Sequence, residues 1–137
     1  MKKTVLLSSI FLACVSVLFA DEDTPLEKQM QLMARSMKQL SQQITDPAKN
    51  HDSITLIETL KLAAATSMDL KPKKTSSIPA ADQQQFLTEY KAQISKLSEA
   101  FNQIEEALKA DKNDQAKTLL STVGSIKKEG HAKFKQD

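Results

Sequence analysis

Residues 26–44 read LEKQMQLMARSMKQLSQQI, and this stretch decides the fold. Its apolar side chains recur at alternating steps of four and three residues, which sets one apolar stripe along a helix: Leu26, Met30, Met33, Met37, Leu40 and Ile44. The start is well marked, because Thr24 can cap the helix, Pro25 suits its first position and Glu27 completes a capping box. The pattern therefore predicts an amphipathic helix that ends at Thr45-Asp46-Pro47.

The same kind of stripe recurs three times further along the chain. We expect helices from about residue 52 or 53 to 70, from 80 to 109, and from 114 to near the C-terminus. The third stripe contains Phe86, Tyr90, Ile94, Leu97, Phe101, Ile104 and Leu108, and the fourth contains Ala116, Leu119, Val123, Ile126, Gly130 and Phe134. No segment alternates with the period of two that marks a strand. The sequence predicts an all-α, antiparallel up-down-up-down four-helix bundle.

The first twenty residues differ from the rest. Lys2 and Lys3 precede an apolar run at residues 5–19, and Ala20 is followed at once by acidic residues. This order is typical of a secretory signal peptide, so we expect residues 1–20 to be removed and residues 21–137 to form the bundle. An uncleaved membrane anchor is the alternative, but the apolar run is short for a membrane span.

The composition of the mature chain excludes several classes of function. Cys14 is the only cysteine, and it lies in the apolar run, so cleavage leaves no thiol for a disulfide or a metal site. (Lipidation of Cys14 would instead leave an apolar start to the mature chain.) Losing Lys2 and Lys3 lowers the count of Lys and Arg from 19 to 17, equal to the 17 Asp and Glu. A net charge near zero does not favour a nucleic-acid partner.

Two histidines are present, and one of them has a candidate partner. His51 lies in the predicted break before the second helix, where we expect a solvated loop residue. His131 lies six residues before the C-terminus, and Met30 lies six residues after Thr24, so each is about 9 Å from the same end of an up-down bundle. Met sulfur and His nitrogen are a known axial pair for haem iron, which makes Met30 and His131 candidate haem ligands.

Other side chains near that end would complete such a site. The candidate pocket walls are Met33, Met37, Leu97, Phe101, Val123 and Phe134. The candidates to pair with haem propionates are Lys127, Lys128, Lys133 and Lys135. No Cys-x-x-Cys-His occurs, so a haem would be held without thioether bonds.

Two other interpretations remain open from the residues alone. A methionine stripe is ordinary core packing, and a histidine near a helix C-terminus interacts well with the helix dipole, so the bundle would then be a structural or interaction protein. Met30, Met33 and Met37 with His131 nearby would also offer soft ligands to Cu(I). An enzyme is not supported, because no nucleophile–base pair or Glu-x-x-His pair is found.

The chain resembles the soluble cytochrome b562 family over nearly all of residues 21–137. The resemblance rests on residues 26–30 (LEKQM), 104–109 (IEEALK) and 131–135 (HAKFK), and on the proline-containing link between the second and third helices. It implies a periplasmic single-electron carrier, not an enzyme, with one non-covalent haem b per chain. In this resemblance Met30 and His131 are the axial ligands.

The chain departs from the family pattern near the site. Gly130 and Lys127 stand where the best-known member has an aromatic residue and an arginine, and Gln93 and Leu97 stand where phenylalanines pack beside the haem. These differences predict a looser haem pocket. We expect a monomer without a membrane anchor after signal cleavage, and the sequence does not identify its redox partners.

Overall fold

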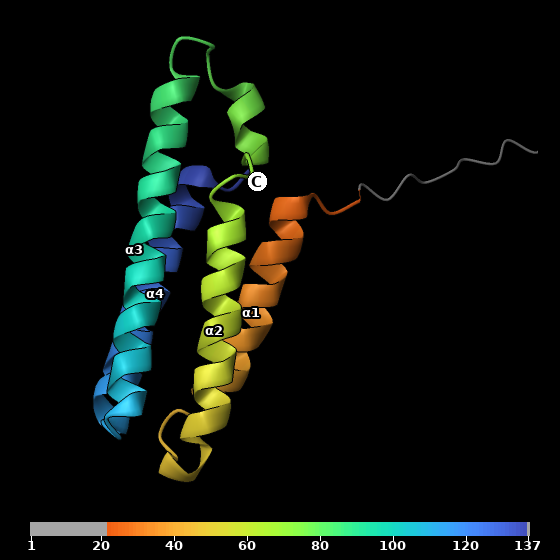
Figure 1. The fold of residues 1–137 in the computed structure, drawn as a ribbon. Coiled ribbons are helices and arrows are strands. Elements are labelled where there is room, and N and C mark those ends of the chain that lie inside the picture. The colour runs from red at the N-terminus through yellow and green to blue at the C-terminus, as the bar shows by residue number, and fades with distance from the viewer. Residues whose placement is uncertain (1–21, 137) are drawn as a thin grey trace, which may run out of the picture.

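The computed structural model describes residues 22–136 (Figure 1). It contains four long helices, α1 (Pro25–Gln43), α2 (Asn50–Ser67), α3 (Gln83–Lys109) and α4 (Asn113–Phe134), and two short 3-10 helices, η1 (Pro47–Lys49) and η2 (Lys73–Ser77). No strand occurs within the described range. The predicted all-α four-helix bundle is therefore confirmed. The expected signal peptide, its cleavage site and Cys14 lie outside the described residues.

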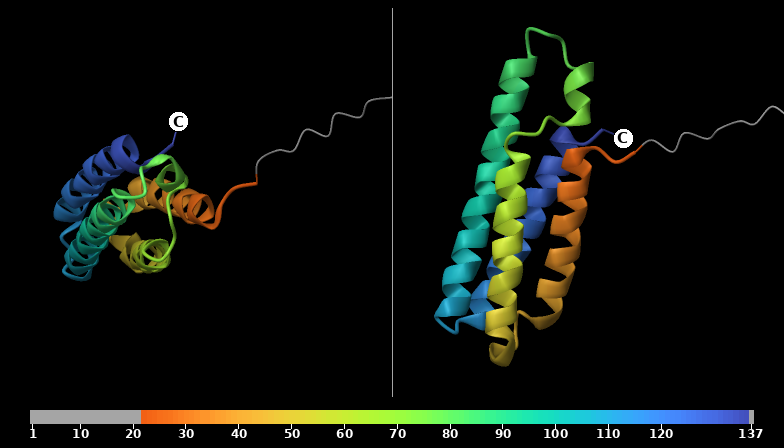
Figure 2. Two further views of the ribbon diagram at one scale, coloured as in Figure 1. Left: turned by 90° about the horizontal axis from the view of Figure 1, so that it is seen from above. Right: turned by 45° about the vertical axis from the view of Figure 1, so that its right-hand side comes forward.

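Helices that follow one another in the chain pack side by side and run in opposite directions. The close pairs are α1 with α2, α2 with α3, and α3 with α4. An end-on view shows α1 and α4 completing the square (Figure 2), but these two do not form a closely packed pair within residues 22–136. The start of α1 and the end of α4 lie at one end of the bundle, called here the upper end as drawn in Figure 1.

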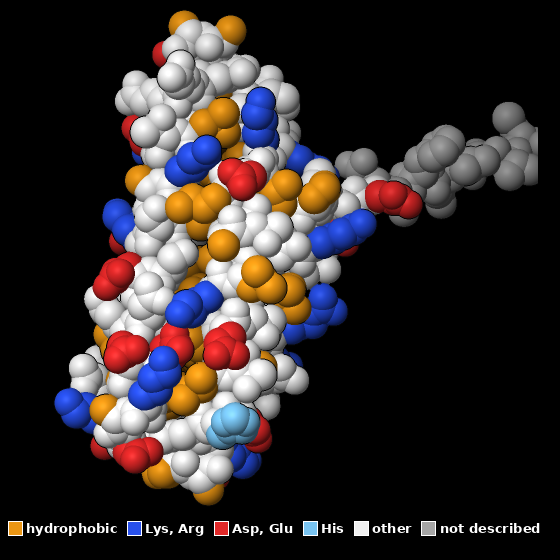
Figure 3. Space-filling model, viewed as in Figure 1, with side chains coloured by type: hydrophobic (Ala, Val, Ile, Leu, Met, Phe, Trp, Pro, Cys, Tyr) orange, Lys and Arg blue, Asp and Glu red, His pale blue; other side chains and the backbone are white. Residues whose placement is uncertain are grey.

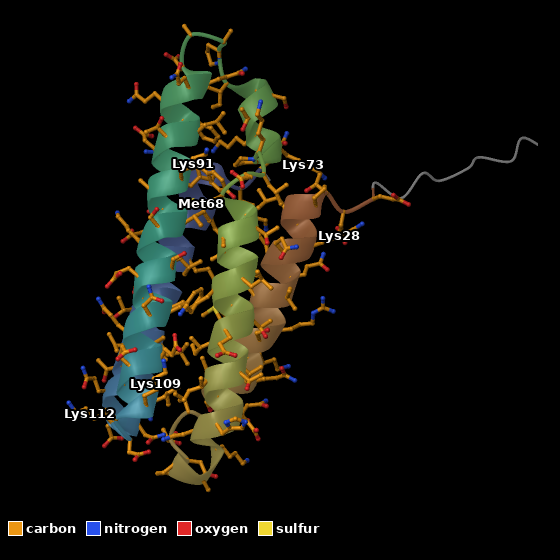
Figure 4. The ribbon with its side chains drawn as sticks, viewed as in Figure 1. Lys28, Met68, Lys73, Lys91, Lys109 and Lys112 are labelled. Carbon is orange, nitrogen blue, oxygen red and sulfur yellow. The ribbon has the colours of Figure 1, made fainter. Side chains whose placement is uncertain are left out.

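The first helix begins as the sequence predicts. The hydroxyl of Thr24 accepts from the N–H of Glu27 at 3.2 Å, and the Glu27 carboxylate accepts from the N–H of Thr24 at 2.6 Å. The capping box is thus confirmed. The ammonium of Lys73 on η2 lies 3.1 Å from the other carboxylate oxygen of Glu27, which holds the α2–α3 link over the start of α1 (Figure 4).

The predicted stripes form the core. The fully buried side chains include Leu40, Ile57, Leu60, Phe101 and Ile104. They come from the first three helices, and Val123 is the matching residue of α4. Burial of such stripes is what holds an amphipathic bundle together, since isolated helices of this length are marginal in water.

The second helix begins earlier than the sequence predicts. It starts at Asn50, so the expectation that His51 lies in a loop is wrong, although its side chain is exposed as expected. The reason is that the Asp46 carboxylate accepts from the N–H of Ala48 and starts η1, which runs directly into α2. The predicted polar link at residues 71–79 also has structure of its own, because η2 forms inside it.

A buried pair of amides ties the lower end together. Asn113 donates to the carbonyl of Ile44 and to the side-chain oxygen of Asn50, both at 2.7 Å. Asn50 in turn donates to the carboxylate of Asp111 at 2.8 Å and to the carbonyl of Leu108 at 3.2 Å. Since buried amides must find partners, this network fixes how the ends of all four helices meet.

A buried carboxylate near the lower end of α3 links this helix to α2. Glu105 on α3, which is 7% exposed, lies 2.6 Å from the ammonium of Lys61 on α2 and 2.7 Å from that of Lys109 on its own helix. Hydrogen bonds from Lys109 and Lys61 hold the pKa of the Glu105 carboxyl below its usual value. The carboxylate therefore stays charged and compensated although it is buried.

Candidate functional site

The candidate ligand Met30 lies on the apolar face of α1, little more than one turn from the helix start at Pro25. Its side chain is partly buried, unlike that of Met33 one turn further along, which is 4% exposed. Met37, two turns along, is again partly buried. The thioether of Met30 therefore lies at the edge of the core, where a ligand entering from the side of the bundle can reach it.

The candidate ligand His131 lies in the last turn of α4, and its side chain is exposed. Partial burial of the ring lowers the pKa of His131 below its ordinary value, and the positive charges of Lys127 and Lys135 lower it further. A lowered pKa favours the neutral form of the ring. A neutral imidazole has a free nitrogen lone pair and can bind a metal ion.

Aromatic side chains anchor the end of α4 on α3. The ring of Phe134, three residues after His131, meets the ring of Phe86 edge-on at a centroid distance of 5.2 Å and that of Tyr90 at 5.6 Å. Phe134 is 8% exposed. The ring is thus packed on α3, and the place of Phe134 in a ligand pocket stays a prediction.

Two polar contacts extend this anchor. Gln93 donates from its side-chain nitrogen to the carbonyl of Ile126 at 2.8 Å, and a carboxylate oxygen of Glu89 lies 2.6 Å from the ammonium of Lys133. The α3 residues in these contacts recur at steps of three, one and three, and form what we call the α3 contact face: Phe86, Glu89, Tyr90 and Gln93. The last two turns of α4 are therefore held by α3.

The face of α4 next to His131 is open. Leu120, Gly124, Lys127 and His131 follow one another at helical spacing, so they share a face about 100° from Gly130. A side chain added at Gly124 would meet no atom within 4 Å. Since α1 and α4 are not closely paired among residues 22–136, the seam between the helices that carry Met30 and His131 is less tightly packed than the contacts of α1 with α2 and of α3 with α4.

Two open hollows lie elsewhere on the described part of the chain. One is lined by the α2–α3 link and Gln136, and a second by residues of α3 and α4 near the lower end. Neither includes Met30 or His131. A planar group would thus enter the α1–α4 seam by moving α1 and α4 apart.

The other predicted site residues divide into two groups. Met33, Phe101 and Val123 are buried in the core, while Met37 and Leu97 are partly buried. Of the lysines, Lys133 is paired with Glu89 rather than free for a propionate, which corrects that expectation, whereas Lys127, Lys128 and Lys135 are exposed. No cluster of three His, Cys, Asp or Glu side chains that could hold a metal ion occurs among residues 22–136.

Gln93 and Gly130, two positions at which the chain departs from the family pattern, lie next to each other. A Cβ on Gly130 would come within 3.3 Å of the Cγ of Gln93, closer than most real Cβ contacts. The sequence marked both positions as unusual but did not show that they touch. No sequence pattern pointed to Glu89, because its partner follows from how α3 and α4 pair.

Comparison with known families gave one match. A family model described as Cytochrome b562 matches residues 25–135, which is almost all of the described chain. Neither the curated proteins nor the solved structures compared with the chain gave a match. No helix among the described residues is both long and apolar enough to cross a membrane.

Proposed function

Because the chain belongs to the cytochrome b562 family, whose members carry electrons on haem b and are not enzymes, we propose that it is a periplasmic b-type cytochrome. It would hold one non-covalent haem b between α1 and α4, with Met30 and His131 as axial ligands. The observation that carries this proposal is the loosely closed α1–α4 seam, with a partly buried thioether on one helix and an imidazole on the other at the same end.

Contacts at the lower end of the bundle set the heights of Met30, Met33 and His131, and these heights favour one methionine as the ligand. The bond from Asn113 to the carbonyl of Ile44 sets the start of α4 level with the end of α1. At about 1.5 Å per residue, Met30 then lies about 21 Å up α1, Met33 about 17 Å, and His131 about 27 Å up α4. Side chains lean toward the N-terminus of their helix, so that of Met30 leans up and that of His131 leans down. Met30 is therefore the better partner for His131.

The residues present suit a haem and give each part of the chain a role. A bound haem would supply a one-electron Fe³⁺/Fe²⁺ couple. Met30 and His131 would fill both axial positions, which keeps water and small ligands off the metal. Partly buried Met37 and Leu97 would offer apolar contact at the seam, and Lys127, Lys128 and Lys135 would be available to carboxylates at the solvent edge.

Export and a monomeric state are parts of the same proposal. The order of charged, apolar and small residues at positions 1–20 supports export. Charged side chains of both signs are interspersed on the face shown in Figure 3, around an apolar stripe, and Leu32 and Leu62 are the large apolar side chains exposed in the described range. Such a surface suits a monomer that meets redox partners transiently.

An absorbance titration of the purified mature protein with haem, oxidised and reduced, tests the proposal. We expect saturation at one haem per chain with the sharp bands of a low-spin, six-coordinate iron. Absence of a saturable change, with the helical circular-dichroism spectrum intact, would rule out the cytochrome. A parallel titration with Cu(I) then shows whether the methionines and His131 serve a soft metal instead.

A further inference from the structure

Gln93 and Gly130 form a contact that has no assigned role. The side chain of Gln93 crosses from α3 to α4, and its Nε2 donates to the carbonyl of Ile126 at 2.8 Å. In an α-helix that same carbonyl accepts from the N–H four residues on, which here belongs to Gly130. A carbonyl oxygen has two lone pairs and can accept both bonds. Gln93 therefore bonds to the turn that leads into His131.

Gly130 makes this contact possible. Its missing side chain leaves the space that the stem of Gln93 occupies, since an added Cβ would lie 3.3 Å from Cγ and 3.8 Å from Nε2 of Gln93. Ile126 and Gly130 are one turn apart on the same face of α4. The amide of Gln93 thus fits into a recess beside Gly130, and an added Cβ would force the stem of Gln93 to give by a few tenths of an ångström.

The position of this recess matters because His131 is the next residue. Gly130 faces α3, so His131 projects about 100° away from it, beside the open face of α4. A rotation of the last turn by ~20° would move a ring nitrogen by roughly 2 Å, whereas a ligand must be held within about 0.5 Å and 10–20° of its working geometry. The direction of the imidazole therefore depends on what fixes residues 126–130 against α3.

The other contacts of the α3 contact face do not replace this one. Glu89 and the aromatic rings hold Lys133 and Phe134, which follow His131, and both Glu89 and Lys133 are substantially exposed. Gln93 is the member of the α3 contact face that holds the residues before His131. Contacts with α3 therefore hold α4 both before and after His131 in the sequence.

We propose that Gln93, seated in the recess at Gly130, is a positioning residue that sets the direction of the His131 imidazole and so tunes its bond to the haem iron. This inference rests on the proposed function. Residues of this kind, which orient a ligand without touching the metal, change metal affinity by roughly 10–100-fold when they are replaced.

The first variant is Gln93→Met, which keeps the length of the side chain and removes the donor. We expect a haem Kd raised by roughly tenfold or more, a shifted reduction potential, and a larger high-spin fraction. In the haem-free protein we expect faster hydrogen exchange at residues 130–134. The matched control is Gln103→Met, an exposed glutamine of the same helix that bonds only to Glu99, and it should change none of these.

A double-mutant cycle tests the recess itself. Gly130→Ala should displace Gln93 and reproduce the shift in potential, and it should add little further in the Gln93→Ala background. Thermal unfolding of each variant shows that the fold is retained.

The outcomes separate the two proposals. A wild type without a low-spin haem spectrum would overturn the proposed function before any variant is made. A haem-loaded wild type whose potential, spin state and exchange rates are unchanged by Gln93→Met would overturn the positioning role alone.

Discussion

The hydroxyl of Tyr90 on α3 donates a 2.8 Å hydrogen bond to the backbone carbonyl of Ser67, the last residue of α2. Carbonyls at a helix C-terminus lack partners within the helix. That of Ser67 accepts from the N–H of Leu70 at 3.2 Å, and Tyr90 supplies a second donor from the neighbouring helix. The same ring meets Phe134 edge-on at 5.6 Å. One side chain thus joins the ends of α2 and α4 at the upper end.

The ionisation of Tyr90 is the first prediction. Burial raises the pKa of Tyr90 to about 12, above the value of about 10 expected in an unfolded chain. Tyr90 is the only tyrosine, so phenolate absorbance reports it alone. We expect the phenol of Tyr90 not to ionise near pH 10 in the folded protein. The contribution of the protonated phenol to the free energy of unfolding should be complete below pH 10 and lost as the pH rises toward 12. Ionisation near pH 10 in the folded protein would contradict this.

The second prediction concerns the axial ligands. Met30→Leu and His131→Ala should each abolish the low-spin, six-coordinate spectrum of the haem complex, because each leaves one axial position empty. The matched control is Met68→Leu, a partly buried methionine at the end of α2, which should leave the spectrum unchanged. If the spectrum survives Met30→Leu and is lost in Met33→Leu, the assignment of Met30 is wrong.

The third prediction concerns protons at His131. In the haem-free protein, an NMR titration should give a pKa for His131 below about 6.5, the ordinary value for histidine. A lowered pKa disfavours the charged ring in the folded state. The contribution of His131 to the free energy of unfolding is therefore complete above pH 6.5. It is lost as the pH falls toward the pKa of His131 in the folded protein.

Changing the neighbouring charges tests the cause of that shift. Lys127→Gln with Lys135→Gln should raise the pKa of His131, because both lysines repel a proton on the ring. Since iron binds the neutral imidazole, the pH at which half of the haem is lost should rise with it. Lys112→Gln with Lys117→Gln removes the same charge near the start of α4 and should shift neither value.

The fourth prediction concerns the amide network at the lower end. Asn113→Ala should lower the free energy of unfolding by about 1–3 kcal/mol, because it leaves the buried Asn50 without one of its partners. Chemical denaturation measures this. Asn102→Ala, at an exposed position of α3, is the control and should cost much less. Equal stability of the two variants would mean that the network does not hold the lower end.

The helices could be predicted because their signals are local. The spacing from Leu26 to Ile44 and the box at Thr24 depend only on neighbours within one or two turns, and both are confirmed. The start of α2 was missed because η1, which begins with the bond from the N–H of Ala48 to Asp46, runs directly into Asn50. The side chain of Asn50 has its own partners, Leu108, Asp111 and Asn113, about 60 residues away in sequence. Sequence periodicity cannot show such partners.

The site could be predicted only in outline. Helix lengths and the up-down order were enough to place Met30 and His131 at one end, and their role as ligands stays a prediction. The pairing of Lys133 with Glu89 and the fit of Gln93 against Gly130 depend on the packing of α3 on α4. These contacts decide which groups remain free for a ligand, and sequence spacing does not contain them.

The loosely closed seam between α1 and α4 bears on the order in which the protein is assembled. Every close helix pair joins elements that follow one another in the chain, and contacts between near neighbours in sequence form quickly. The pair α1 and α4, which would join the two ends of the described chain, is the neighbouring pair that does not pack closely. We therefore expect the three close helix pairs to form early in folding, and the seam between α1 and α4 to close last.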